Sequence, residues 1–408
     1  MKSVLKRSSP SNSQKPDTFF STSGNSYIDI NNYTPPTGLG PVISLFTGAG
    51  GMEIGLENAG FTTSVCVEMN ADCRETLKKN RPNWRLFEDD YNRKAGDIRT
   101  ISAKELLALA GIKSGAAGLV TGGAPCQPFS NIGNKMGKND PTNGDLFLEF
   151  VKVVKGVMPK AFIFENVAGI AQKQHSDVVE YMKRQFDGLG YGISFDILNS
   201  ANYGVPQTRK RFIMIGLKGQ KPMLPLPTHS KGFLEWKRFT NTLNACPNYS
   251  PKPWRTVEDA FKKITKTRTK RADCVGMKHS DLVINRMKLI KQGENFKVLP
   301  MEMRPNCWRT GKHQGHDTFG RIEANKPAPT IRTAGYNPTK GKYIHPYEHR
   351  GLNTAEMAIL QNFPIRWKFQ TVSGKPSIVS IGRQIGNAVP PGLSEAIGKA
   401  LALQFSSE

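Results

Sequence analysis

The chain has few cysteines and no long apolar run, and each absence excludes a class of protein. Six cysteines among 408 residues, without paired spacing, do not make a disulfide framework, so we expect a reducing compartment. No apolar run approaches the roughly 20 residues of a membrane-spanning helix. The N-terminus lacks the apolar segment of a secretory signal, and the chain shows no internal repeat. We therefore expect a soluble intracellular protein with no membrane partner.

Acidic residues are scarce as well. Lys and Arg number 57 against 33 Asp and Glu, which gives a formal net charge of +24. The excess is uneven, because residues 208–313 hold 24 basic and 7 acidic residues. A generally basic protein would spread its charge. A concentrated excess favours a polyanionic partner, most simply nucleic acid.

Short apolar runs and amphipathic stretches alternate between residues 41 and 216. The runs predict strands, and the stretches with apolar residues at helical spacing predict helices. The predicted strands are 42–46, 64–68, 119–121, 161–164, 193–198 and 212–216, and the predicted helices are 52–59, 71–79, 103–110 and 144–158. Strands that alternate with helices predict an α/β fold, with a mostly parallel sheet and helices on both of its faces.

Composition divides the chain further. Residues 1–38 are rich in Ser, Asn, Thr and Pro, which predicts a disordered tail. Residues 39–220 carry the α/β pattern, whereas residues 221–358 are basic, rich in Pro and weakly periodic, which predicts a second, less regular domain. Residues 359–408 act as a hinge and recover a helical pattern, and we expect this segment to pack back on the α/β domain. Its apolar stripe consists of Leu393, Ile397, Leu401 and Phe405.

One cysteine lies in a conformationally restricted loop, Gly122-Gly123-Ala124-Pro125-Cys126-Gln127-Pro128-Phe129-Ser130. This loop directly follows the predicted strand 119–121. Each proline fixes its own φ and restricts the residue before it, so the loop should hold Cys126 in one place at a strand end. Such a loop suits a nucleophile, and a buried structural thiol is the alternative.

Glycines and an acid follow the first two predicted strands. Gly48, Gly50 and Gly51 let the main chain approach a ligand closely. Glu68 ends the next strand, where a carboxylate can accept both hydroxyls of a ribose. Glu53 stands where a G-x-G-x-x-G motif needs its last glycine, so a phosphate-free nucleoside such as S-adenosylmethionine fits better than a dinucleotide. A tight turn without a ligand would give the same pattern.

Two further polar groups accompany predicted strands. Glu165 ends the fourth apolar run, the usual place for function in an open α/β sheet, although it could also cap the helix that follows. Arg209 and Arg211 are separated by one residue just before strand 212–216, so they share one face of an extended segment. Paired guanidiniums suit a phosphate or a base carbonyl, and a solvated basic edge strand is the alternative.

Together these features resemble the C5-cytosine-specific DNA methyltransferase family, over nearly the whole chain after residue 38. The resemblance implies a Rossmann-like, S-adenosylmethionine-dependent methyltransferase fold, with residues 221–358 as a target-recognition domain. Each motif alone is modest, but their joint occurrence in this order is specific. In order they are Phe46-Thr47-Gly48-Ala49-Gly50-Gly51, Glu68, Asp97, Pro125-Cys126-Gln127, Glu165-Asn166-Val167, Gln207-Thr208-Arg209-Lys210-Arg211, the segment from Arg350 to Pro364, and Gly386-Asn387-Ala388-Val389-Pro390-Pro391.

The family chemistry gives these residues roles. Cys126 would attack C6 of a cytosine as a thiolate, and C5 would then take a methyl group from S-adenosylmethionine. Glu165 would hydrogen-bond the base at N3 and at its amino group. Arg209 and Arg211 would hold the base carbonyl, the flanking phosphate and the carboxylate. The cytosine must first be flipped out of the duplex.

The resemblance also implies a cofactor site. Glu68 would bind the ribose hydroxyls, and Asp97 would accept the adenine amino group. The full set of expected cofactor-binding residues is Phe46, Gly48, Gly50, Glu68, Met69, Asp97, Ile98, Pro125, Leu146, Asn387 and Val389.

For the partner, the resemblance implies duplex DNA read at a specific site. The expected DNA-binding residues are Gln127, Ser130, Gln207, Arg209, Arg304 and Arg309. A cognate restriction endonuclease acting on the same site is a candidate second partner. We expect a monomer without a metal site, located in the cytoplasm at the nucleoid of a prokaryote or in the nucleus of a eukaryote.

Two other functions compete with this hypothesis. The same chemistry acts on tRNA in one branch of the family, although the large basic domain after residue 216 favours duplex DNA. A DNA-binding regulator without catalysis is the second alternative. Intact Cys126, Glu165, Arg209 and Arg211 argue against it.

Overall fold

A sheet of seven strands organises the protein. Its structure is a computed structural model that describes residues 25–88, 95–124, 146–172, 176–232, 249–264, 266–309 and 317–405. The strand order is β4-β3-β2-β5-β6-β8-β7. The strands are Pro41–Leu45 (β2), Thr62–Val67 (β3), Arg85–Leu86 (β4), Leu119–Gly122 (β5), Ala161–Val167 (β6), Tyr191–Asn199 (β7) and Lys210–Lys218 (β8). Strand β8 pairs antiparallel with β6 and β7, and the other pairs are parallel, which confirms the predicted sheet type.

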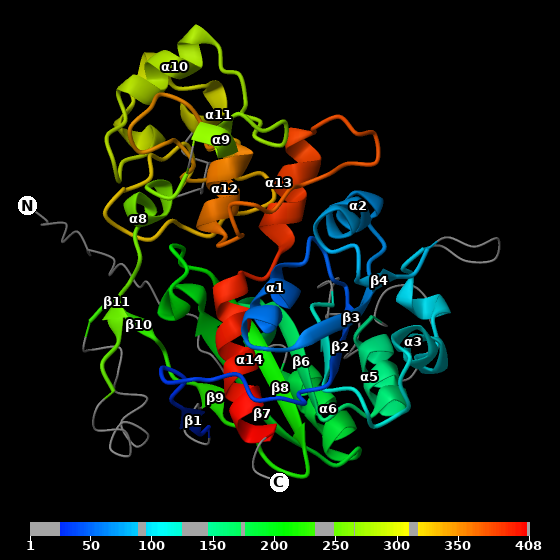
Figure 1. Ribbon diagram of the computed structural model, residues 1–408. Helices are drawn as coiled ribbons and strands as arrows, with labels where there is room; N and C mark the ends of the chain where they lie inside the picture. Colours follow the sequence, from blue (N-terminus) through cyan, green and yellow to red (C-terminus); the bar gives the residue numbers. More distant parts are fainter. Residues whose placement is uncertain are drawn as a thin grey trace, which may run out of the picture.

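Helices cover both faces of this sheet (Figure 1). They are Gly51–Asn58 (α1), Ala71–Asn80 (α2), Ala103–Ala110 (α3), Leu146–Val157 (α5), Ser176–Asp187 (α6) and Pro391–Phe405 (α14). Successive residues of a strand point to opposite faces, and both faces here are apolar. Ile43 of β2 accordingly lies in one core with Phe150 of α5, whereas Val42 lies in another core with Leu56 of α1 and Ile397 of α14.

The C-terminal helix α14 returns to the α/β domain as the sequence predicts. Leu393, Ile397 and Leu401 of its apolar stripe are buried in the core beneath α1. The rings of Phe61 and Phe405 meet edge to face, with 5.9 Å between their centroids. This helix therefore closes the sheet domain with residues from the far end of the chain (Figure 1).

The segment before β2 departs from the prediction of a tail that extends to residue 38. Residues Tyr27–Ile28 (β1) pair in parallel with Leu224–Pro225 (β9). The Tyr27 hydroxyl donates to Asp196 Oδ2 at 2.9 Å, and the Tyr33 hydroxyl donates to the Ala59 carbonyl at 2.5 Å. The tail prediction is thus wrong for residues 25–38, because Tyr27 and Ile30 are buried in the core and β1 pairs with β9. Residues 1–24 lie outside the described part.

The second domain consists of short elements. They are His229–Ser230 (β10), Lys252–Pro253 (β11), Val257–Phe261 (α8), Lys266–Thr269 (α9), Asp281–Lys288 (α10) and Asn306–Arg309 (α11), with 3-10 turns at Phe296–Val298 (η7), Met301–Met303 (η8) and Pro338–Lys340 (η9). A small apolar cluster lies among them, made of Met287, Ile290, Phe296, Leu299, Trp308, Phe319 and Ile344. Among the described helices, none is long and apolar enough to cross a membrane.

Helices Thr354–Leu360 (α12) and Ile378–Asn387 (α13) connect the second domain to α14. One apolar core runs through this junction. It packs Cys66 and Trp84 of the α/β domain with Ile331, Leu360 and Ile385. The junction therefore fixes α13 above the edge of the sheet where parallel strands end (Figure 1).

Candidate active site

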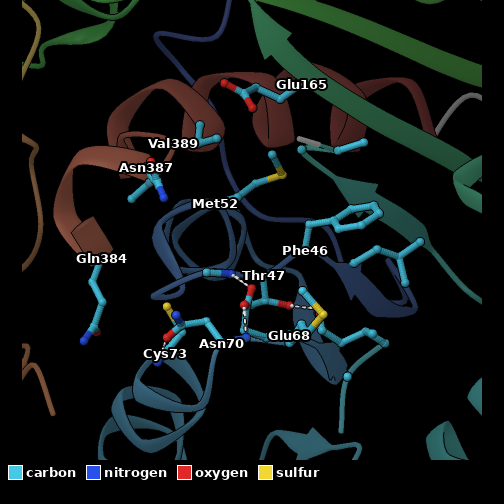
Figure 2. Close-up of a pocket in the computed structure, with 18 of the residues that line it drawn as sticks. Phe46, Thr47, Met52, Glu68, Asn70, Cys73, Glu165, Gln384, Asn387 and Val389 are labelled. Carbon is cyan, nitrogen blue, oxygen red and sulfur yellow. Dashed lines mark hydrogen bonds between the residues drawn. The ribbon is translucent and has the colours of Figure 1, made fainter. Parts of the chain in front are cut away.

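A cavity of about 610 Å³ lies at the carboxyl ends of β2, β3, β5 and β6. Parallel strands end at one edge of a sheet, so the loops that follow them meet there. Figure 2 shows Glu165 and Glu68 on opposite sides of this space, with Phe46 between them. The predicted residues that line the cavity are Phe46, Gly48, Glu68, Met69, Asp97, Ile98, Leu146, Glu165, Arg209, Arg211, Asn387 and Val389.

The turn after β2 is built from left-handed backbone. Phe46, Gly48 and Gly50 have φ values of 55°, 58° and 85°. A Cβ on Gly48 would meet no atom within 4 Å, so this glycine faces open space. Gly50 instead caps the N-terminus of α1, and a Cβ there would lie 3.0–3.3 Å from buried side chains such as Trp367. Gly50 is not among the described residues lining the cavity, and its contact with a cofactor stays a prediction.

Glu68 is held by main-chain donors. Gly48 N donates to its Oε2 at 2.6 Å, and Asn70 N donates to its Oε1 at 2.7 Å. Burial raises the pKa of Glu68, while these two hydrogen bonds and the Arg74 charge oppose the rise. The Asn70 side chain in turn caps α2 by accepting from Cys73 N at 3.0 Å. The carboxylate therefore has a fixed orientation at the cavity wall (Figure 2).

Asp97 lies beside Glu68 because of a glycine. Gly96 has φ of 66°, and a Cβ there would lie 2.1 Å from the Glu68 carbonyl oxygen. The close approach of the two chain segments therefore requires glycine. Both oxygens of Asp97 accept from the Arg99 guanidinium, with Nε to Oδ1 at 2.9 Å and Nη2 to Oδ2 at 2.7 Å.

Glu165 and Arg211 form an ion pair at the opposite side. Arg211 Nε lies 2.8 Å from Glu165 Oε1, and the two side chains are only 13% and 12% exposed. Burial raises the pKa of Glu165, and the charges of Arg211 and Arg209 oppose this shift. A Cβ on Gly123 would lie 2.7 Å from Glu165 Oε2, so the carboxyl group packs against the main chain that follows β5.

Arg209 and Gln207 are buried at the domain junction. Arg209 is 1% exposed, and its guanidinium donates to the carbonyls of Ile331 and Gly386 at 2.9 and 2.8 Å. Gln207 is fully buried and donates to the Leu360 carbonyl at 3.1 Å. Both side chains therefore join the α/β domain to the segments around Ile331 and Leu360, and their contact with DNA stays a prediction. Burial lowers the pKa of Arg209 to about 9.

The cysteine loop lies outside the described residues, with Pro125, Cys126, Gln127 and Ser130. The described chain reaches Ala124, whose carbonyl accepts from Asn166 Nδ2 at 3.2 Å. Asn166 follows Glu165 in β6, so this hydrogen bond ties the start of the loop to the strand that carries the acid. This geometry brings the residue two positions before Cys126 to the Glu165 end of the cavity.

The two arginines predicted to read DNA are bonded to main-chain carbonyls. Arg304 donates to the Leu299 carbonyl at 2.8 Å, and Arg309 donates to the Glu302 carbonyl at 2.9 Å. Neither residue is among those described that line the cavity. Their contact with DNA stays a prediction.

Sequence reasoning missed several lining residues. Arg383 and Gln384 of α13 line the cavity with Asn387, one helical turn before it, so helical periodicity ahead of the Gly386-Asn387 motif could have indicated them. Arg99 is only two residues after Asp97. The missed lining residues include Thr47, Met52, Glu53, Asn70, Cys73, Arg99, Ser380, Arg383 and Gln384.

Comparisons with known proteins agree on one family. The family model of C-5 cytosine-specific DNA methylases matches residues 41–402. The Type II methyltransferase M.Sau96I of Staphylococcus aureus is 30% identical over 378 residues, which cover 92% of this chain and 78% of that protein. The Type II methyltransferase M1.HphI of Haemophilus parahaemolyticus is 31% identical over 374 residues, covering 90% and 87%.

A solved structure has the same fold. It is a crystal structure of a putative DNA modification methyltransferase encoded within a prophage of E. coli. The TM-score is 0.62 at 22% identity, and the match covers 90% of this chain and 99% of that one. The shared architecture thus extends through the second domain as well as the sheet.

Proposed function

The chain belongs to the C-5 cytosine-specific DNA methylase family and is a DNA (cytosine-5)-methyltransferase that uses S-adenosylmethionine, and we propose that its cavity holds both cofactor and target cytosine. The observation that carries this proposal is that acidic side chains line the same cavity at two separate places. Glu68 and Asp97 lie at one side, and the Glu165–Arg211 pair lies at the other.

The residues present fit the cofactor. A volume of about 610 Å³ falls within the range of roughly 300–1,000 Å³ for small-molecule sites. The Glu68 carboxylate, already oriented by two main-chain donors, would accept the ribose hydroxyls. Phe46 and Ile98 supply apolar surface for a base. Glu53 stands where a G-x-G-x-x-G motif needs its last glycine, so a phosphate-free nucleoside is favoured over a dinucleotide. When bound, the cofactor supplies a methyl group activated by its sulfonium.

The reaction would proceed from the opposite end. The Cys126 thiolate bonds to C6 of the flipped cytosine, which gives C5 the character of an enamine. Glu165 would hydrogen-bond the base at N3 and at its amino group and would stabilise the charge that develops there. Arg211 holds Glu165 in place. After C5 takes the methyl group, loss of the C5 proton and of Cys126 restores the aromatic ring.

Duplex DNA would bind across the second domain. Unstacking and unpairing one cytosine costs roughly a few kcal/mol, which contacts to the flanking backbone must offset. Lys and Arg of this domain would supply affinity that weakens with salt. Arg304 and Arg309 remain our candidates for contacts near the target cytosine, because both lie at short elements of the basic second domain.

Transfer of labelled methyl groups from S-adenosylmethionine to duplex DNA tests this function. We expect incorporation into duplex DNA rather than tRNA, and we expect Cys126→Ser to abolish it. Full activity of that variant would overturn the mechanism, and preference for tRNA would overturn the substrate. Bisulfite sequencing of DNA from cells that express the protein would report the methylated site.

We also propose that the protein acts as a monomer beside a separate restriction endonuclease of the same site. The support is that the similar proteins M.Sau96I and M1.HphI are named Type II methyltransferases. In a prokaryote it would then work at the nucleoid, where its substrate lies. Sedimentation equilibrium tests the monomer. Plasmid from expressing cells should resist the endonuclease whose site bisulfite sequencing identifies, and cleavage of methylated sites would contradict the pairing.

A further inference from the structure

The two acids at the cofactor end of the cavity are held in different ways. Glu68 receives its hydrogen bonds from main-chain N–H groups of Gly48 and Asn70. Asp97 receives the forked guanidinium of Arg99, which occupies both of its oxygens. The Asp97 side chain is 11% exposed, whereas the Arg99 side chain is 52% exposed. One acid is therefore fixed by the backbone, and the other by a side chain at the cavity mouth.

A bidentate arginine leaves a carboxylate able to accept more. Each carboxylate oxygen offers about two lone-pair sites, and the fork of Arg99 takes one of them on each oxygen of Asp97. The fork also fixes the plane of the carboxylate, because both N–H···O bonds must stay aligned. A ligand donor that approaches from the cavity then meets an acceptor that needs no reorientation.

Arg99 itself faces the ligand space. It is one of the residues that line the cavity, together with Asp97 and Ile98. A guanidinium can stack on an aromatic ring while it donates in its own plane. The local turn assists, since Arg99 N also donates to Asp97 Oδ1 at 3.2 Å, which keeps the two side chains on the same 3-10 turn.

We propose that Arg99 is a positioning residue for the adenine end of the cofactor, which orients Asp97 to accept the adenine amino group and to reject a carbonyl at that position. This inference rests on the proposed function. An amino group donates to the oriented carboxylate. A carbonyl oxygen in the same place would face a carboxylate oxygen, and neither could donate.

The test compares two ligands that differ at one ring position, S-adenosylhomocysteine with an amino group and S-inosylhomocysteine with a carbonyl. Dissociation constants are measured by calorimetry on the full chain. We expect Arg99→Met to weaken S-adenosylhomocysteine about tenfold, the equivalent of 1.4 kcal/mol, and to leave S-inosylhomocysteine nearly unchanged. Arg99→Lys keeps the charge but lacks the forked donor, so its affinity for S-adenosylhomocysteine should lie between those of wild type and Arg99→Met.

Lys152→Met is the matched control. Lys152 is a nearby exposed cation of α5, 69% exposed and paired with Glu149 at 2.7 Å, so its removal changes the net charge equally. We expect wild-type affinity for both ligands from this variant. An equal loss for both ligands in Arg99→Met would assign Arg99 a general electrostatic or structural role and overturn the inference. Unchanged or tighter binding of S-adenosylhomocysteine would also overturn it. A wild-type protein that binds neither ligand would instead refute the proposed function.

Discussion

Hydrogen bonds between strands connect the α/β domain, whereas in the second domain the side chain of Arg321 adds to a few isolated bridges between irregular segments. Arg321 is 4% exposed and donates to the carbonyls of Met287, Ile290, His345 and Glu348. The distances run from 2.5 to 2.7 Å. Buried carbonyls need donors, and here a guanidinium supplies them in place of neighbouring strands.

This difference changes how the basic charge is interpreted. Arg286, Arg304 and Arg309 of the same region also donate to main-chain carbonyls. Part of the excess that the sequence attributes to a polyanionic partner thus supports the fold. The lesson is that a count of arginines overestimates the phosphate contacts of a domain with little regular structure.

The largest effect on stability should come from removing the Arg321 guanidinium. Arg321→Met would remove a buried guanidinium that donates to four main-chain carbonyls, so we expect a loss of about 3–5 kcal/mol in the free energy of unfolding of the second domain. Urea denaturation measures it. Binding of S-adenosylhomocysteine should persist, because Arg321 is not among the described residues that line the cavity, while duplex DNA binding is lost.

Arg255→Met is the control for Arg321→Met. Arg255 is exposed, and the described residues give its guanidinium no hydrogen-bond partner. We expect the Arg255→Met variant to unfold at the same urea concentration as the wild type. If Arg321→Met and Arg255→Met unfolded at the same urea concentration, Arg321 would not support the domain.

A smaller and more local effect is expected in the sheet domain. An alanine Cβ at Gly123 would displace the end of the Glu165 side chain, 2.7 Å away, which a flexible carboxyl can accommodate without unfolding. The displaced acid should lower the methyl-transfer rate about a hundredfold. The rate is measured by transfer of labelled methyl groups, and the free energy of unfolding is measured separately by urea denaturation.

Gly169→Ala is the control for Gly123→Ala. Gly169 follows β6, the strand that carries Glu165, and the nearest atom to its Cβ position is 4.0 Å away. We expect an active, stable protein. A rate for Gly123→Ala equal to that of the control would contradict the close packing of Glu165 against the loop.

The sheet and its acids were predictable because they follow simple periodicities. Apolar runs located the strands, and an acid at the end of a parallel strand had to reach the shared edge, as Glu68 and Glu165 do. Helix boundaries came close where Gly and capping residues mark them. The predicted helix 103–110 matches α3, which begins with a capping box of Ser102 and Glu105.

The other features depend on contacts between distant segments. Nothing local shows that Gln207 and Arg209 face the Ile331 and Leu360 main chain, more than 120 residues later. The same holds for Tyr27, whose partner is Asp196. Arg99 was missed for a different reason, since the family pattern drew attention only to Asp97 and Ile98 in this turn.

A buried acid should make the stability of the α/β domain depend on pH. Glu53 of α1 is 1% exposed, and burial raises its pKa from 4.5 to about 7. Ser44 Oγ donates to its Oε1 at 2.6 Å, while the described residues offer Oε2 no partner. The folded state therefore binds this proton more tightly than the unfolded state. The resulting stability is fully present below pH 4.5 and is lost as pH rises through about 7.

Glu53→Gln removes that titration while it keeps an acceptor for Ser44. We expect the variant to be more stable than wild type at pH 8 by about 1–3 kcal/mol, and to match it near pH 4.5. Urea denaturation between these pH values measures the difference, with the second domain as an internal reference if it unfolds separately. Parallel stability curves for the two proteins would show that Glu53 does not titrate in this range.

The smallest effect should come from a surface charge of the second domain. Lys262 Nζ lies 3.3 Å from Glu258 Oε1 one helical turn earlier, and the side chains are 68% and 47% exposed. Solvent screens such a pair, so Lys262→Met should change the free energy of unfolding by no more than about 0.5 kcal/mol. Urea denaturation at low and high salt checks it, since the small difference should vanish at high salt. A loss comparable to that of Arg321→Met would mean that exposed and buried cations support this domain alike, and the contrast drawn from Arg321 would fail.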